Sequence, residues 1–72
     1  ERLLTDRELD ILRLAACGLS NADIASRLSV SMRTVQAHLT QVFNKLGSSS
    51  RTEAVIAGLR RGMLKLEDLG ED

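Results

Sequence analysis

Apolar side chains recur at helical spacing along most of the chain, in stretches separated by short polar links. Each of these stretches follows a Ser or Thr that can cap a helix N-terminus, and together they cover residues 6–16, 21–28, 32–46 and 51–61. No run alternates polar and apolar residues for long enough to indicate a strand. The pattern therefore predicts an all-α domain of four helices, with at most one further turn among the leucines and acids after Gly62.

The residues that flank the predicted helices support these boundaries. Three pairs have the spacing of a capping box, in which each side chain accepts the other residue's backbone N–H: Thr5 with Glu8, Ser20 with Asp23, and Ser50 with Glu53. Gly47 follows the end of the third helix, where a left-handed residue commonly terminates a helix. The connectors are therefore only a few residues long, as in small helical bundles.

Residues 29–31 are the link between the second and third predicted helices. A link of this length is too short for a broad antiparallel hairpin, but it suits two helices that meet at a large angle. The sequence therefore predicts a helix-turn-helix motif.

The third predicted helix has a polar face opposite its apolar stripe, and most of that face is uncharged. An advance of 100° per residue places small and polar side chains there: Arg33, Gln36, Ala37, Thr40, Gln41 and Asn44. Arg can donate two hydrogen bonds to guanine, Gln and Asn can pair with adenine, and Ala or Thr can contact the thymine methyl group. The face suits base recognition, although an ordinary solvent-exposed helix could also have this composition.

The formal net charge of zero conceals an uneven distribution along the chain. Residues 13–65 contain eight basic and two acidic residues, whereas the ends are acidic, with four acidic residues in residues 66–72. A basic centre is compatible with a nucleic-acid partner. The helix starts at Ser20 and Ser31 also present free amides and partial positive charge, which makes both of them candidate phosphate anchors.

Several other classes of protein fit the sequence poorly. A chain of 72 residues is enough for one small domain, and no apolar run approaches the ~20 residues that cross a bilayer. One Cys and one His provide no metal-ligand set of standard spacing, and no nucleophile, base and phosphate-binding loop occur together. We therefore expect no catalysis, no cofactor, no metal site and no membrane partner.

Three further expectations concern the chain as a whole. Residues 1–72 are expected to form a single domain excised from a longer regulator, because the chain starts without Met. Cys17 is the only cysteine and is expected to fill a small space in the core. The absence of a second cysteine is compatible with a cytoplasmic location.

The sequence also resembles the DNA-binding domain of LuxR/FixJ/GerE type, which is the C-terminal effector domain of many bacterial transcription regulators. The resemblance covers Leu4 to about Gly62, and its five segments are "LTDRELDIL", "GLSNADIASRLSVS", "RTVQAHL", "VFNKLG" and "SRTEAV". It implies that residues 32–46 enter the major groove of double-stranded DNA and that the fourth helix forms a homodimer contact. An upstream regulatory domain and RNA polymerase are further expected partners.

The resemblance also implies roles for individual residues. Base contacts are expected at Arg33, Gln36, Ala37, Thr40 and Gln41, and phosphate-facing or capping roles at Asn21, Thr34, His38 and Lys45. The sequence departs from the family pattern at Gln36, where a Lys usually follows "TV". A cation lost at that position should weaken the salt-dependent part of DNA binding and leave hydrogen-bonded base recognition intact.

Alternatives remain open for four residues and for the function. Arg51 could contact a phosphate or pair with an acid, and His38 could be packed or bonded to a phosphate. Ile56 could belong to the core or, with Arg60, to a dimer contact, although Arg60 also suits a helix C-terminus. A protein-interaction bundle without DNA binding is the main alternative function, and RNA recognition is disfavoured by the single aromatic residue.

Overall fold

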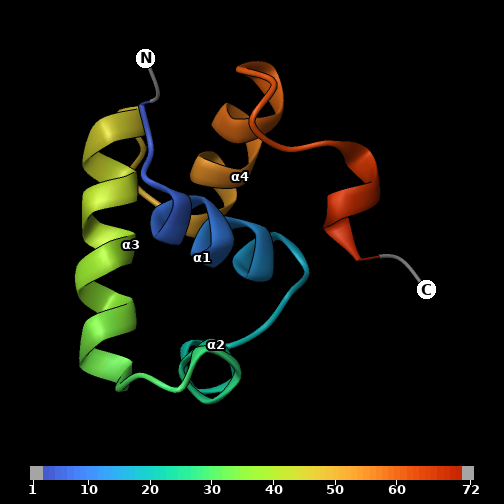
Figure 1. The fold of residues 1–72 in the computed structure, drawn as a ribbon. Coiled ribbons are helices and arrows are strands. Elements are labelled where there is room, and N and C mark those ends of the chain that lie inside the picture. Colours follow the sequence, from blue (N-terminus) through green and yellow to red (C-terminus); the bar gives the residue numbers. More distant parts are fainter. Residues whose placement is uncertain (1–2, 71–72) are drawn as a thin grey trace.

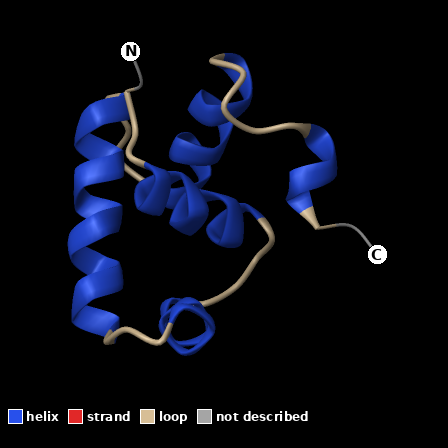
Figure 2. Ribbon diagram, viewed as in Figure 1, coloured by secondary structure: helices blue, strands red, loops and turns tan. Residues whose placement is uncertain are grey.

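The fold is built around one central helix, which is the first in the chain. The computed structural model describes residues 3–70, which form α1 (Asp6–Ala16), α2 (Asn21–Leu28), α3 (Met32–Leu46), α4 (Arg51–Arg60) and a 3₁₀ turn, η1 (Leu66–Leu69). Helix α1 packs against all the others, with α3 on one side and η1 on the opposite side (Figure 1). Every regular element in the described range is helical (Figure 2). The predicted four-helix fold is therefore confirmed, except that α4 ends at Arg60 and Arg61 is its C-cap.

The predicted N-caps are present, but of the three predicted capping boxes only that of α1 is complete. At α2, only the Ser20 side chain accepts a bond, from the Asp23 N–H. At α1, Thr5 Oγ1 accepts the Glu8 N–H at 3.1 Å and Glu8 Oε1 accepts the Thr5 N–H at 2.9 Å, which completes the box. At α4, Ser50 Oγ accepts the Glu53 N–H at 3.2 Å. The Glu53 carboxylate instead accepts the N–H of Ser49, at 2.8 Å. The predicted box fails because Glu53 reaches one residue further back.

The link between α2 and α3 turns sharply at Ser29. This residue is left-handed, with φ 59° and ψ 42°, and it is the only non-glycine residue with positive φ among residues 3–70. The following N–H, of Val30, donates to Ala25 O at 3.0 Å and closes the end of α2. In Figure 1, α2 is seen along its axis whereas α3 stands upright in the plane of the view. The two helices therefore meet at a large angle, as the short link predicts.

The core consists of two apolar clusters that share α1 and α3. One lies between these helices and α2, and its buried members are Ile11, Ala15, Ile24, Ala25, Val35 and Leu39. The other lies toward α4, with one residue before α1 and one after α4, and its buried members are Leu4, Leu12, Val42, Leu46, Ala54 and Leu64. Half-buried Phe43 packs against both clusters. Both halves of α3 are therefore anchored from the same side, which leaves its opposite face free.

The prediction that Cys17 fills the core is wrong. Cys17 is exposed at the C-cap of α1, and its Sγ donates to Asp68 O at 3.0 Å. The physical reason is its position, because it lies two residues after buried Ala15 and so about 200° around the helix from it. The thiol contacts the C-terminal turn instead.

Residues 3–70 contain no helix that is both long enough and apolar enough to span a membrane.

Candidate nucleic-acid interface

The exposed face of α3 is the first part of the candidate site. Val35, Leu39 and Val42 on the opposite face are buried, which fixes the rotation of the helix about its axis. The side chains expected to contact bases are all exposed: Arg33, Gln36, Ala37, Thr40 and Gln41. These side chains therefore share an exposed face, on which base contact stays a prediction, and Asn44 is exposed on the same helix.

The Thr40 hydroxyl is already committed to a hydrogen bond within α3. Its Oγ1 donates to the backbone O of Gln36, one turn earlier, at 2.9 Å. A hydroxyl has one proton but two lone pairs, so in this rotamer Thr40 offers an acceptor and a methyl group to a ligand, not a donor. Gln36 keeps its side chain exposed while its carbonyl accepts this bond.

The serines expected to anchor phosphates serve as helix caps. Ser20 Oγ accepts the Asp23 N–H at 3.1 Å, and Ser31 Oγ accepts the Thr34 N–H at 3.1 Å. The Ser31 and Thr34 hydroxyls also lie 3.0 Å apart and share a hydrogen bond. Each cap satisfies one amide of its helix N-terminus, where the positive end of the helix dipole still favours an anion.

Arg51 brings the starts of α2 and α4 together. Its Nη2 donates to Asn21 Oδ1 at 2.7 Å, and its Nη1 donates to the backbone O of Leu19. Both acceptors are neutral, so the acid considered from the sequence is not the partner found here, and a phosphate contact stays a prediction. The bonded side chains border a surface groove of about 490 Å³, lined by Asn21, Gln36, Leu39, Thr40, Phe43 and Arg51. The structure thus gathers residues of both predicted classes, base-reading and phosphate-binding, around one groove.

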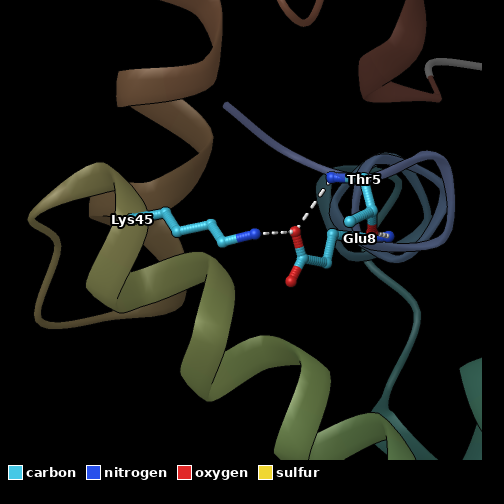
Figure 3. A network of polar contacts seen from close by, with 3 residues as sticks. All are labelled: Thr5, Glu8 and Lys45. Atoms are coloured by element: carbon cyan, nitrogen blue, oxygen red, sulfur yellow. Dashed lines mark hydrogen bonds and ion pairs between the residues drawn. The ribbon is translucent and has the colours of Figure 1, made fainter. Parts of the chain in front are cut away.

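Lys45 and His38 lie at the edge of the α3 face and are both half-buried. Lys45 Nζ donates to Glu8 Oε1 at 2.8 Å, as Figure 3 shows. Glu8 is the one buried charged residue within residues 3–70, at 5% exposure, and the sequence reasoning missed its burial. Its capping-box position with Thr5 was visible in the sequence, but its ion pair joins residues 37 positions apart and leaves no local pattern.

Burial by itself raises the pKa of Glu8. Hydrogen bonds from Lys45 and Thr5, together with the positive charge of Lys45, outweigh that effect, and the net pKa lies below its ordinary value. Glu8 is therefore a carboxylate at neutral pH, and it links α1 to α3 without taking part in the exposed face.

The outer face of α4 carries the two residues assigned to a possible dimer contact. Ile56 is 44% exposed, so it is not a core residue. Arg60 is exposed as well, and both side chains border a shallow surface pocket of about 370 Å³ beside Gly47 and Glu53.

Within residues 3–70, no group of three or more His, Cys, Asp or Glu side chains is placed to hold a metal ion.

Comparison with known families gives a match over most of the chain. Residues 2–57 match the family model described as "Bacterial regulatory proteins, luxR family". Among relatives, Mb0914c of Mycobacterium bovis, provisionally named an HTH-type transcriptional regulator, is 58% identical over 59 residues, which are 82% of this chain and 7% of that protein.

Two solved structures share both fold and sequence. The transcription factor GerE has a TM-score of 0.86 and 39% identity over 92% of this chain and 98% of its own. The response regulator ChrA, from a heme-sensing two-component system, has a TM-score of 0.84 and 36% identity over 89% of this chain and 32% of its own. The chain thus corresponds to nearly all of the GerE structure but to a minor part of ChrA and of Mb0914c.

Proposed function

This chain belongs to the luxR family of bacterial regulatory proteins, as a helix-turn-helix DNA-binding domain, and we propose that it reads DNA sequence with α3 in the major groove. The family consists of transcription regulators, so the expectation that the chain is not an enzyme agrees with its membership. A bacterial regulator of this type meets its DNA in the cytoplasm, which we propose as the location.

The exposed face of α3 is the observation that carries this proposal. Arg33, Gln36 and Gln41 can hydrogen-bond to base edges, and the small side chain of Ala37 between them allows close approach. The major groove, about 12 Å wide, admits one α-helix. A helix anchored through its opposite face by two core clusters can present these side chains without rearrangement.

Phosphate contacts are proposed for the residues that flank this face. They come from the N-termini of α2 and α3 and from the edges of α3: Ser20, Asn21, Ser31, Thr34, His38 and Lys45. The free amides and the positive end of the dipole at the first turn of α2 and α3 support this assignment. Such contacts fix the position of α3 on the duplex, while base contacts choose the sequence.

Gln36 sets the expected balance between affinity and selectivity. A neutral side chain at this position releases no counterion on binding, whereas a Lys would. We therefore propose that this domain depends less on ionic contacts than relatives with Lys at the same position, and relies more on hydrogen bonds from α3.

A homodimer through α4 is proposed for the bound state. In an antiparallel pair of α4 helices centred between Ile56 and Ala57, Glu53 of one copy would lie opposite Arg60 of its partner. Such a contact is self-complementary, as twofold symmetry requires, and the exposed side chain of Ile56 would be covered at its centre. Two copies would then read half-sites about one helical turn apart.

Partners beyond DNA are proposals for the longer protein. The chain matches 32% of ChrA and 7% of Mb0914c, so in those proteins other segments accompany the matching part. We propose that an upstream regulatory domain controls this one, and that RNA polymerase is contacted at the promoter.

A salt titration tests the DNA-binding proposal. Duplexes are first selected from random sequence with the 72-residue chain, and the affinity for the best duplex is measured between about 50 and 300 mM salt. Each phosphate contact to a cation should contribute about −0.9 to the slope of log affinity against log salt concentration. A measurable slope with selection of a defined site supports the proposal. A zero slope with no enriched site would instead favour a protein-interaction bundle.

A further inference from the structure

We propose that Arg51 is a positioning residue, which holds the start of α2 for DNA contact and does not itself bind phosphate. This inference rests on the proposed DNA binding and gives Arg51 a part in it. The sequence alone also allows the guanidinium of Arg51 to contact a phosphate directly. The hydrogen bonds of Arg51 in the structure indicate a positioning role instead.

The guanidinium of Arg51 spans the N-terminal end of α2. Nη1 donates to the O of Leu19, and Nη2 donates to Oδ1 of Asn21, 30 positions away in sequence, at 2.7 Å. The two acceptors flank Ser20, which is the N-cap of α2. Because a guanidinium is planar and rigid, two bonds from its terminal nitrogens fix both distance and orientation between the starts of α2 and α4.

These bonds also orient the Asn21 side chain. A guanidinium has donors and no acceptor, so the end of the carboxamide that faces Arg51 must be its oxygen. The amide group, with two donors, then becomes the end of Asn21 available to a ligand. Asn21 borders the groove that also contains Gln36 and Thr40, so these donors lie beside the proposed reading face.

The two bonds restrict how Arg51 can meet a phosphate. They fix the orientation of its guanidinium, and the residue is half-buried. A phosphate oxygen could reach only the three remaining N–H groups, in the directions that these bonds leave. Asn21 is half-buried as well, but its side-chain amide group makes no hydrogen bond within residues 3–70 and can donate to a phosphate without breaking one, so Arg51 acts on DNA through Asn21.

Replacing Arg51 by Lys separates the two roles, because Lys keeps the positive charge but cannot make two fixed bonds. The probe is a duplex of about 20 base pairs obtained by selection with the unmodified chain. We expect Arg51→Lys and Arg51→Gln each to weaken binding about tenfold, with the salt slope unchanged. Asn21→Ala should weaken binding similarly, and adding it to Arg51→Gln should cause no further loss.

The opposite pattern would overturn the inference. If Arg51 binds phosphate directly, Arg51→Lys should bind nearly as well as the unmodified chain, and Arg51→Gln should reduce the salt slope by about 0.9. Its effect should also add to that of Asn21→Ala. Arg13→Lys, an exposed arginine on α1, is the matched control and should change neither affinity nor slope. Thermal unfolding confirms that each variant is folded.

A measurement without DNA keeps this inference separate from the proposed function. In NMR spectra of the free chain, the side-chain amide signals of Asn21 should shift in Arg51→Lys, while those of Gln41 should not. Unshifted Asn21 signals would overturn the positioning role of Arg51 even if the unmodified chain binds DNA. Shifted signals in a chain that binds no duplex would support the bonds between Arg51 and Asn21 and reject the DNA-binding proposal instead.

Discussion

Lys45 of α3 and Glu8 of α1 form an ion pair, with Nζ 2.8 Å from Oε1 (Figure 3). The same carboxylate oxygen accepts the N–H of Thr5, so Glu8 both completes the cap of α1 and connects it to α3. Glu8 is buried, whereas the Lys45 side chain is 31% exposed. The pair therefore stabilises the angle at which α3 crosses α1 and leaves the outer edge of Lys45 in contact with water.

Stability should fall in acid because of Glu8. The pKa of its carboxyl group in the folded protein is lowered, since the bonds from Lys45 and Thr5 outweigh burial. The resulting stabilisation is complete above the ordinary glutamate pKa of about 4.3 and is lost as the pH falls through the lower, folded-state value. Urea unfolding between pH 2 and 7 should show this loss. Glu8→Gln should be less stable at pH 7 and have a shallower pH dependence, and an unchanged profile would contradict the assignment.

Removal of Lys45 should destabilise the domain by about 1–3 kcal/mol, because it leaves the buried Glu8 carboxylate without its cationic partner. Urea unfolding of Lys45→Ala at pH 7 measures this cost. Lys65→Ala is the control, since Lys65 is exposed and lies outside the four α-helices. If both variants lose equally little stability, the ion pair does not support the fold.

The helices could be predicted from sequence because their signals are local. Caps and glycines lie next to the ends they determine, and periodicity identified the buried stripe of α3 and so its exposed face. The capping box predicted at α4 is absent because the same local pattern lets the Glu53 carboxylate accept the N–H of either Ser50 or Ser49, and it accepts that of Ser49. The prediction that Cys17 is buried was wrong because it rested on how often a lone cysteine is buried and not on the angle of Cys17 around α1.

The partners of the charged residues could not be predicted in this way. Arg51 donates hydrogen bonds to Leu19 and Asn21, and Lys45 pairs with Glu8, so each contact joins elements far apart in sequence. Such pairs depend on how helices cross, which no local pattern encodes. The resemblance to a known family gave Asn21 and Lys45 phosphate-facing or capping roles, but it did not distinguish a residue that contacts DNA from one that holds the fold.

Ser29→Gly should stabilise the domain by up to about 1 kcal/mol. Ser29 adopts the left-handed conformation at the end of α2, which Gly enters without the steric cost of a Cβ atom. The control is Ser26→Gly, an exposed position inside α2, where Gly should cost about 0.5–1 kcal/mol. Thermal unfolding of both variants should therefore give shifts of opposite sign. Equal destabilisation would contradict the argument from backbone conformation.

Gln36→Lys should strengthen DNA binding and make it more dependent on salt. One added cation near a phosphate should make the slope of log affinity against log salt concentration more negative by about 0.9. Gln36→Ala should leave the slope unchanged but alter the preferred bases in a selection from random duplexes, because it removes only hydrogen bonds. A change in slope for Gln36→Ala, or an unchanged site preference, would contradict a base-reading role for Gln36.

Ile56→Asp should prevent dimer formation if α4 is the contact between copies. The substitution would place two like charges near the twofold axis and remove the exposed apolar side chain that a partner would cover. Sedimentation of the DNA-bound complex should show one copy per duplex instead of two, with weaker binding to a site of two half-sites. Leu66→Asp is the matched control, because Leu66 is 74% exposed on η1 and lies outside α4. Equal stoichiometry for Ile56→Asp and the unmodified chain would place the contact elsewhere.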